Sequence, residues 1–542
     1  MASVFQHRMA VHPARRGRIR HPWRIAAIVG ALVVTGLVIG LAPIVSFSSE
    51  AARAQVVAVL SDRLDGEVQL DTLRGRVFPR LRVEGSGLSI RHKGRRDVPP
   101  LISIKSFSAE GNLLALYRKH IPLVTVDGLE MQIPPDRNRD VDATGTTDRV
   151  VTAKGQTDTS TRDLARTLVI DELLSTAARL VIIPAEKEKQ PKVWDIHRLR
   201  MAAVSVGQPM PFVASLANAV PPGEIETRGT FGPWRSEKPG QTALDGTFIF
   251  DRADLGVFRG ISGLLSAHGT FGGVLGRIDI HGETETPDFN VTAGGHPMPL
   301  HTTYHAIVDG TNGNTLLERV DGNFLNTSLV AKGGVADTPG KEGRTVTLDI
   351  VMDHGRLEDV LRLAVKTPHP PMTGALQLKT TLVLPPGDQD VVKKLRLDGR
   401  FSIAGTRFTD LDVQHKINEL SRRSRGQAAK MQSQRVASQF HGAFSLRAGR
   451  LTIPEVTFDI PGAVVRLAGT YDLVPETLNF RGMLFMDAKV SDTTTGIKRL
   501  LLKIVDPIFR KDGGGSKIPI QISGKRSDPS FGLDKGRLFK RQ

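Results

Sequence analysis

The sequence contains no cysteine among its 542 residues. Disulfide bonds, thiolate metal sites and cysteine nucleophiles are therefore excluded, and cysteine usage says nothing about the compartment. Aromatic residues are also scarce, at 5%, whereas 54 glycines and 32 prolines are present. So many turn-forming residues favour short strands over long helices.

Acidic residues are missing from the first 24 positions, which hold six arginines and a charge of +6. From Gly496 to the end, twelve lysines and arginines stand against four aspartates, giving +8. Of the formal net charge of +17, only +3 then remains for the body between. A nucleic-acid groove needs its positive charge on the folded body. We therefore expect no nucleic-acid partner and favour contact with a membrane.

One long run without charged residues extends from Ile25 to Phe47. At about 1.5 Å per residue, it spans roughly 34 Å as a helix, enough for the hydrocarbon core. Because arginines precede it and Glu50 follows, the positive-inside rule places residues 1–24 in the cytoplasm and the remaining chain outside. A cleaved signal peptide ending near Ala54 is the alternative. The run exceeds the usual signal-peptide core of about 7–15 residues, which favours a retained single-pass anchor.

Helical spacing of apolar residues predicts an amphipathic helix that follows the anchor and ends near Gly66. Further helical patterns cover residues 255–265, 355–366, 414–427 and 494–510. The helix at 494–510 combines an apolar stripe with lysines and arginines. It fits three roles: a cap on the end of a sheet, a helix on a membrane surface, or a partner-binding helix.

In most of the remaining sequence, apolar and polar residues alternate, with glycines between the alternating segments. In "LQLKTTLVL", Leu376, Leu378, Leu382 and Leu384 share one face. The pattern predicts a mainly β (α+β) fold, in which a long, curved antiparallel sheet with a few short helices follows the transmembrane helix. About 20–25 strands at roughly 4.8 Å each would extend about 100–120 Å. An uncovered apolar face would form a groove for a lipid-like ligand, and a covered one an ordinary sandwich core. Periodicity alone leaves both open.

Two similar strings, "IDIHGETETPDFNV" and "IQISGKRSDPSFGL", align on Gly282 and Gly524. Both are interpreted as a strand, a glycine-bounded turn and a short extended exit. The repetition predicts two β-units, 48–291 and 292–542, after the basic tail 1–24 and the anchor 25–47. Residues 136–165 lack periodicity and are predicted to form a disordered loop.

Catalytic motifs are not found in the sequence. "GTFGGVLG" lacks the Lys-Ser/Thr ending of a phosphate loop, and "GISGL" lacks the second glycine of a nucleophile elbow. His296, His301 and His305 are close in sequence, but His301 and His305 on one strand would be about 13 Å apart, too far for one zinc ion. We therefore expect no enzyme activity, no catalytic residue, no cofactor and no metal site.

Four segments together resemble the AsmA-like family of inner-membrane-anchored, mostly periplasmic proteins of Gram-negative bacteria. They are the anchor, "VLSDRLDGEVQLDTLRGRVFPRLRVEGSGLSI", "LVTVDGLEMQI" and "IPIQISGKRSDPSFGLDKGRL". The resemblance covers residues 25–135 and 440–535. It implies a long twisted sheet with a hydrophobic groove, related to repeating β-groove proteins that carry lipids between membranes, and a role in outer-membrane biogenesis.

Residues and resemblance together predict a single-pass protein of the bacterial inner membrane, with most of its chain in the periplasm. It would bind phospholipid acyl chains in its groove and contribute to outer-membrane biogenesis and envelope lipid homeostasis. The predicted lining residues are Leu376, Leu378, Leu382, Leu384, Phe401, Ile403, Phe444 and Leu446. The alternative is a non-transporting scaffold or regulatory factor for outer-membrane protein assembly, which would contact another envelope protein through its sheet edges or basic C-terminus.

Overall fold

The computed structural model describes part of the chain between residues 46 and 534. The described segments are 46–47, 50–64, 66–76, 80–92, 99–112, 115, 117–118, 120–133, 169–183, 192–205, 207–235, 238–292, 295–338, 343–365, 367–425, 438–487 and 516–534. The predicted tail 1–24, loop 136–165 and helix 494–510 lie outside them, as do residues 25–45 of the anchor. None of the helices in these segments has the length and apolar character needed to cross a membrane. Ser46–Phe47, which the anchor was predicted to include, forms strand β1.

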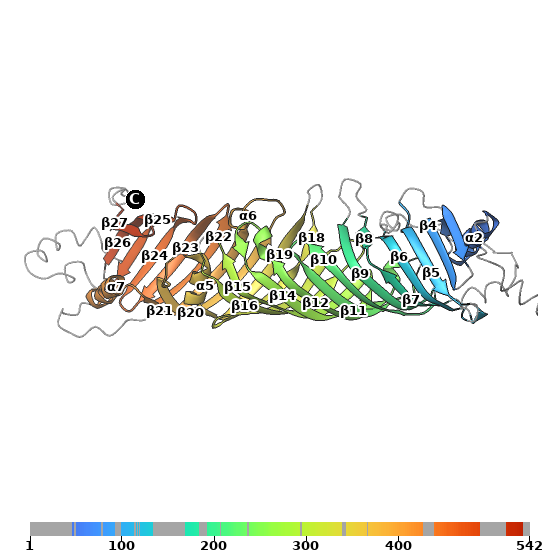
Figure 1. Cartoon of the computed structure of the whole chain (residues 1–542). Coiled ribbons are helices and arrows are strands. Elements are labelled where there is room, and N and C mark those ends of the chain that lie inside the picture. Colours follow the sequence, from blue (N-terminus) through green and yellow to red (C-terminus); the bar gives the residue numbers. More distant parts are fainter. Residues whose placement is uncertain are drawn as a thin grey trace, which may run out of the picture.

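All strands of the described segments belong to one sheet of 27 strands (Figure 1). The first group is β1, β2 (Gly66–Gln69), β3 (Thr72–Arg76), β4 (Leu81–His92), β5 (Ile102–Gly111), β6 (His120–Ile133), β7 (Val169–Ser175), β8 (Ala178–Ile182) and β9 (Lys192–Val204). The second is β10 (Met210–Ala219), β11 (Pro222–Phe231), β12 (Leu244–Asp254), β13 (Ile261–Ser262), β14 (Leu264–Val274), β15 (Arg277–Val291), β16 (Met298–Val308), β17 (Thr315–Phe324) and β18 (Thr327–Asp337). The third is β19 (Arg344–Arg356), β20 (Met372–Leu384), β21 (Arg396–Phe408), β22 (Ser438–Arg447), β23 (Arg450–Ile460), β24 (Ala463–Asp472), β25 (Thr477–Met486), β26 (Ser516–Lys525) and β27 (Asp528–Leu533).

Neighbouring strands follow the order of the chain and pair almost entirely in antiparallel fashion. From β14 to β27, each strand pairs with the next one along the sequence. The exception is β6, which pairs in parallel with β7 and β8. A parallel pair requires a long connection, and the end of β6 at Ile133 is far enough in sequence from the start of β7 at Val169 to allow one. About 24 successive strand positions at about 4.8 Å each give a sheet on the order of 110 Å long.

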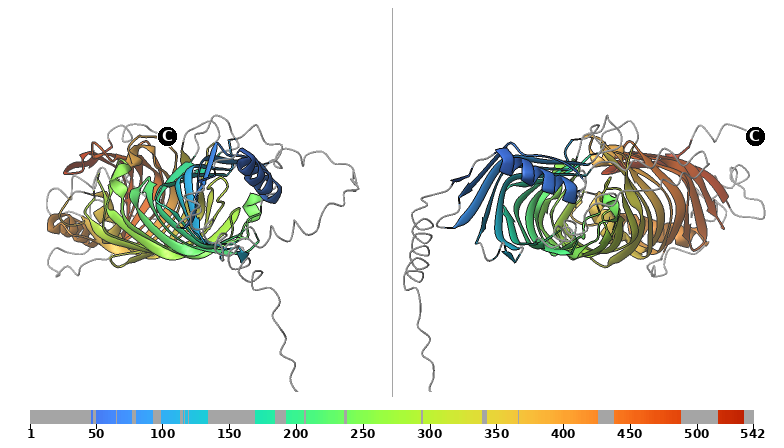
Figure 2. Two further views of the ribbon diagram at one scale, coloured as in Figure 1. Left: turned by 45° about the vertical axis from the view of Figure 1, so that its right-hand side comes forward. Right: turned by 90° about the vertical axis from the view of Figure 1, so that its right-hand side faces the viewer.

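The sheet is curled along its length, with its strands bent around one side (Figure 2). Bulges shift the register in many strand pairs, for example between Thr286 and Phe289 and between Met352 and Gly355. A bulge bends its strand and increases the local twist. Mid-strand glycines such as Gly269 and Gly282, which face each other across β14 and β15, add to the bend. The predicted long, curved antiparallel sheet is thus confirmed.

Four α-helices and two 3₁₀ turns accompany the sheet in the described segments. They are α2 (Glu50–Leu64), α5 (Leu357–Ala364), α6 (Val391–Lys394), α7 (Leu411–Ser424), η2 (Pro239–Gln241) and η3 (Leu255–Val257). The helices α2, α5 and α7 confirm that three of the predicted segments are helical, although the apolar residues of α2 are not gathered on one side as in an amphipathic helix. Helix α7 begins earlier than predicted, because Asp410 Oδ1 accepts a hydrogen bond from Val413 N (3.1 Å) in its first turn.

The prediction of a helix at residues 255–265 is wrong, because only the short η3 is helical there. Two glycines interrupt the segment in the left-handed region, Gly260 (φ +103°) and Gly263 (φ +138°). They return the chain to the sheet as β13 and β14. A helix cannot continue through such backbone angles.

The two similar strings adopt different structures. Gly524 (φ +103°) lies at the hairpin between β26 and β27, where the interpretation as a turn is right. Gly282 lies inside β15, paired with Gly269 and Tyr304, so the interpretation as a turn is wrong there. Strand pairing runs on from β15 to β16, and the sheet therefore has no break near residue 291. The division into units 48–291 and 292–542 stays a prediction about the sequence.

Candidate functional site

The predicted lining residues all lie on one face of three adjacent strands, β20, β21 and β22. The register sets Leu378 opposite Phe401 and Leu376 opposite Ile403. It also sets Gly399 opposite Phe444 and Leu397 opposite Leu446. Side chains directly opposite each other in an antiparallel pair point to the same face. Alternation in the sequence therefore assigned the shared face correctly.

The same face stays apolar along the sheet, and we call it the apolar inner face. Apolar residues of this face are direct cross-strand partners on successive strands. For example, Ile280 pairs with Phe271 on one side and with Ala306 on the other. Its apolar residues include Phe107, Val126, Leu199, Phe212, Phe248, Phe271, Ile280, Tyr304, Leu348, Leu378, Leu382, Phe401, Phe444, Val456, Leu467, Phe480 and Ile520. These side chains are buried or half-buried, whereas their neighbours along each strand are mostly exposed. That difference fits a concave face of a curled sheet.

Three buried clusters hold the fold together on this face. One involves β5 to β10 around Val126, which is 2% exposed. The second lies where Leu357 of α5 packs near Leu376 and Ile403. The third lies under α7 around Phe458. Of the eight predicted residues, Leu376 and Ile403 belong to the second cluster, and Leu446 is buried outside the three clusters. The other five remain partly exposed, and these are Leu378, Leu382, Leu384, Phe401 and Phe444.

On the apolar inner face, several aromatic rings lie over a glycine that is their direct partner on the neighbouring strand. A Cβ on Gly246 would lie 2.7 Å from Phe271, and one on Gly399 would lie 2.9 Å from Phe444. A Cβ on Gly469 would likewise lie 2.7 Å from Phe480. The rings fill the space that a side chain would need, so the face stays smooth and apolar where the sheet bends. The trace of this arrangement in the sequence is a glycine at a position where the alternation of a strand calls for an apolar residue, and alternation alone does not show that a ring covers it.

Charged residues gather on the opposite, outer face, where they form cross-strand ion pairs. Arg200 bonds Glu172 (2.6 Å) and Arg179 bonds Asp195 (2.9 Å). Arg450 bonds Asp472 (2.6 Å), and this guanidinium lowers the pKa of the Asp472 carboxyl. Like-charge repulsion across the strands is thereby avoided. The sheet thus has one apolar face and one ion-paired, solvated face.

Two shallow depressions lie over the outer face. One, of about 500 Å³, is lined by His268, His281, Glu283, Thr303, His305, Arg319 and Asp321, among others. The other, of about 710 Å³, lies over polar residues of β19, β20 and β21 that include Asp349, Lys379 and Arg400. Most of the residues that line them are polar or charged, although the second depression also touches Leu378 and Phe401. The charged side chains around both depressions do not suit an acyl chain. The candidate lipid surface is therefore the open apolar inner face.

The three histidines considered in the sequence lie apart from one another. His296 Nε2 contacts the carbonyl oxygen of Thr367 (2.9 Å). His301 lies on β16 near Glu283 and Glu285, and His305 lies on the same strand opposite His281 of β15. The structure therefore does not bring His296, His301 and His305 together at one point.

Comparison with known proteins gives no match to any family model, curated protein or solved structure. The function must accordingly be inferred from the residues and geometry of this chain.

Proposed function

We propose that the protein is a membrane-anchored, periplasmic lipid-binding or transfer protein that holds phospholipid acyl chains on its apolar inner face. The observation that carries the proposal is the central part of this face, from β12 to β22. Phe248, Phe271, Leu348 and Phe401 are only half-buried there. The described strands form one sheet, and no second sheet among them covers these side chains.

Physical chemistry supports an acyl chain as the occupant. Removing an acyl chain from water contributes about 0.8 kcal/mol per buried CH₂, so an extended hydrocarbon can bind without any catalytic group. A long strip of half-buried apolar side chains offers the same environment at many neighbouring positions. A lipid bound at one position could therefore move along the sheet by small steps of similar free energy.

The predicted anchor gives the proposal its location. A membrane-spanning helix within residues 25–45 would fix the N-terminal end of the sheet at the inner membrane, with the sheet in the periplasm. The basic segment 494–510 would approach anionic headgroups near the other end. This arrangement matches what the resemblance to AsmA-like proteins implies, including a contribution to outer-membrane biogenesis.

A scaffold that transports no lipid is the second candidate, and the last strand favours it. Among the described strands, β27 pairs only with β26. Its Phe531 and Leu533 are 66% and 50% exposed. An open strand edge can add a strand from a partner protein. In this reading, another envelope protein would pair with β27, and the apolar inner face would hold no lipid.

Native mass spectrometry of the detergent-extracted full chain, with quantification of extracted phospholipid, tests the first proposal. Leu378→Glu places a carboxylate on the apolar inner face, whereas Gln377→Glu places the same charge on the outer face of the same strand. Phe401→Glu and Ser402→Glu form a second matched pair on β21. We expect both inner-face variants to lose most of their bound phospholipid and both outer-face variants to keep it.

Equal phospholipid in all four variants, or none in the unmodified protein, would contradict lipid binding on this face. Circular dichroism of each variant checks that the sheet is retained. Loss of lipid from the inner-face variants alone, with unchanged spectra, separates binding from unfolding.

A further inference from the structure

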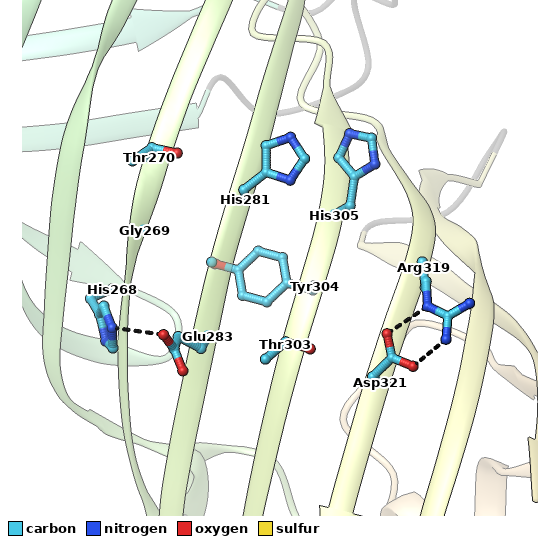
Figure 3. A pocket seen from close by; sticks show the side chains of 11 residues that line it. His268, Gly269, Thr270, His281, Glu283, Thr303, Tyr304, His305, Arg319 and Asp321 are labelled. Atoms are coloured by element: carbon cyan, nitrogen blue, oxygen red, sulfur yellow. Dashed lines mark hydrogen bonds and ion pairs between the residues drawn. The ribbon is translucent and has the colours of Figure 1, made fainter.

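The outer face of β15 and β16 brings one aspartate and two histidines together. Asp279 and His281 are two residues apart on β15 and therefore share a face. The register places His305 of β16 directly opposite His281. Their imidazole rings lie side by side (Figure 3), with ring centres 4.2 Å apart and planes inclined by 12°.

Both imidazoles turn the same ring nitrogen toward one carboxylate oxygen. Asp279 Oδ1 lies 2.8 Å from His305 Nε2 and 3.1 Å from His281 Nε2. One potential ligand atom from each residue lies within 4.8 Å of the other two. A tetrahedral zinc ion with bonds of about 2.0–2.1 Å holds its ligand atoms about 3.3 Å apart. The three side chains therefore need only small shifts to surround an ion.

A second carboxylate orients His305 from its other ring nitrogen. Glu318 Oε2 lies 3.2 Å from His305 Nδ1. The register between β16 and β17 shifts at this point, because His305 pairs with Arg319 and the next residue, Ala306, pairs with Leu317. Glu318 is the extra residue of this bulge and reaches His305 on the outer face. A carboxylate on Nδ1 directs the lone pair of Nε2 outward, as in carboxylate–histidine–zinc arrangements.

The surroundings suit a cation that is reached from solvent. The nearby Arg319 donates two hydrogen bonds of 2.6 Å to Asp321, which neutralises its charge (Figure 3). His281 and His305 line the depression of about 500 Å³, which opens to solvent. A fourth coordination position would therefore be accessible to water or to a donor from a partner.

We propose that Asp279, His281 and His305 form a binding site for a divalent transition-metal ion of the Zn²⁺ class on the outer face of the sheet. Two imidazole nitrogens and one carboxylate oxygen suit such ions. The bound ion would cross-link β15 to β16 near the middle of the sheet. This site is separate from the apolar inner face and does not depend on lipid binding.

Zn²⁺ titration of the chelator-treated full chain in detergent, by calorimetry, tests the site. We expect the unmodified protein to bind one more Zn²⁺ than His281→Ala or His305→Ala. Glu318→Gln should weaken this binding about 10- to 100-fold, because it disturbs the orientation of a ligand. His268→Ala and His301→Ala are matched controls, since both remove an outer-face histidine from a neighbouring position, and they should bind as the unmodified protein does. Histidines elsewhere in the chain are present in the unmodified protein and in every variant. Zn²⁺ that binds to them therefore does not contribute to the difference in stoichiometry.

Asp279→Asn keeps the shape of the side chain and provides a variant that is expected to fold. Thermal unfolding with and without Zn²⁺ completes the test, because an ion that binds only the folded chain raises its melting temperature. That rise should vanish in Asp279→Asn, while the melting temperatures in chelator stay equal. The same Zn²⁺ stoichiometry and affinity in all variants, or no binding by the unmodified protein, would show a metal-free histidine–aspartate cluster and overturn the proposal.

Discussion

The hydroxyl oxygen of Tyr304 lies over Gly282, 2.7 Å from the position that a Cβ of this glycine would occupy. The two residues are direct cross-strand partners on β16 and β15. The glycine leaves space on the inside of the bend, and the tyrosine ring fills it with apolar surface. Curvature and the apolar inner face thus depend on the same contact.

Gly282→Ala should destabilise the sheet because the added methyl group meets the Tyr304 hydroxyl. An overpacked site costs about 1–3 kcal/mol, so we expect a clearly lower midpoint in urea unfolding. Gly272→Ala on β14 is the matched control, since nothing lies within 4 Å of its Cβ position. Equal midpoints for the two variants would show that the sheet bends without this contact.

Tyr304 should ionise at unusually high pH, because burial raises the pKa of its phenol above 10.0. The unfolded chain then releases this proton before the folded chain does. The contribution to stability is therefore complete below about pH 10 and is lost as the pH rises through the folded pKa. An ultraviolet titration of tyrosinate, compared between the unmodified protein and Tyr304→Phe, should assign a component above pH 10 to this residue. A difference spectrum that titrates below pH 10 would contradict the buried position of the phenol.

Asp359 should hold α5 against the sheet. Its buried Oδ2 accepts hydrogen bonds from Asn326 N and from Thr327 Oγ1, both 2.9 Å long. Asp359→Ala leaves these donors without their acceptor, which should cost about 1–3 kcal/mol. Thermal unfolding measures the loss. The exposed Asp353 of β19 supplies the control Asp353→Ala, for which we expect a change near zero.

Phe458 should contribute more to stability than Phe444. Phe458 is 6% exposed and stacks on Phe440, with ring centres 4.3 Å apart. Truncating a buried phenylalanine costs about 3–5 kcal/mol, so Phe458→Ala should unfold at much lower urea concentration. Phe444 is only half-buried, and Phe444→Ala should lose less stability. A reversed order would indicate that the accessible part of the apolar inner face, and not the cluster under α7, holds this end together.

The sequence of a single strand was enough to predict which of its side chains share a face of the sheet. Leu376, Leu378, Leu382 and Leu384 alternate with polar residues, and alternation fixes which side chains share a face once a strand forms. Alternation does not predict that Leu376 lies in the core while Leu378 stays half-exposed. Burial depends on α5, which packs over one end of β20 and not over the other.

The similar strings around Gly282 and Gly524 show where local patterns stop being informative. The same glycine, proline and phenylalanine spacing lies inside β15 in one case and at a hairpin in the other. Which outcome occurs depends on whether a neighbouring strand continues the pairing beyond the glycine. Likewise, His305 has a partner in His281 only through the register of β15 and β16, which no spacing along one strand reveals.

By itself, the sequence determined a mainly β chain, the apolar and polar phases of its strands, and three of its helices, because these depend on residues close in sequence. Only the tertiary structure decided which glycines bend the sheet, which apolar residues stay accessible, and which outer-face side chains meet. Those properties arise from cross-strand register and from the packing of distant segments, where a shift of one residue exchanges the two faces of a strand.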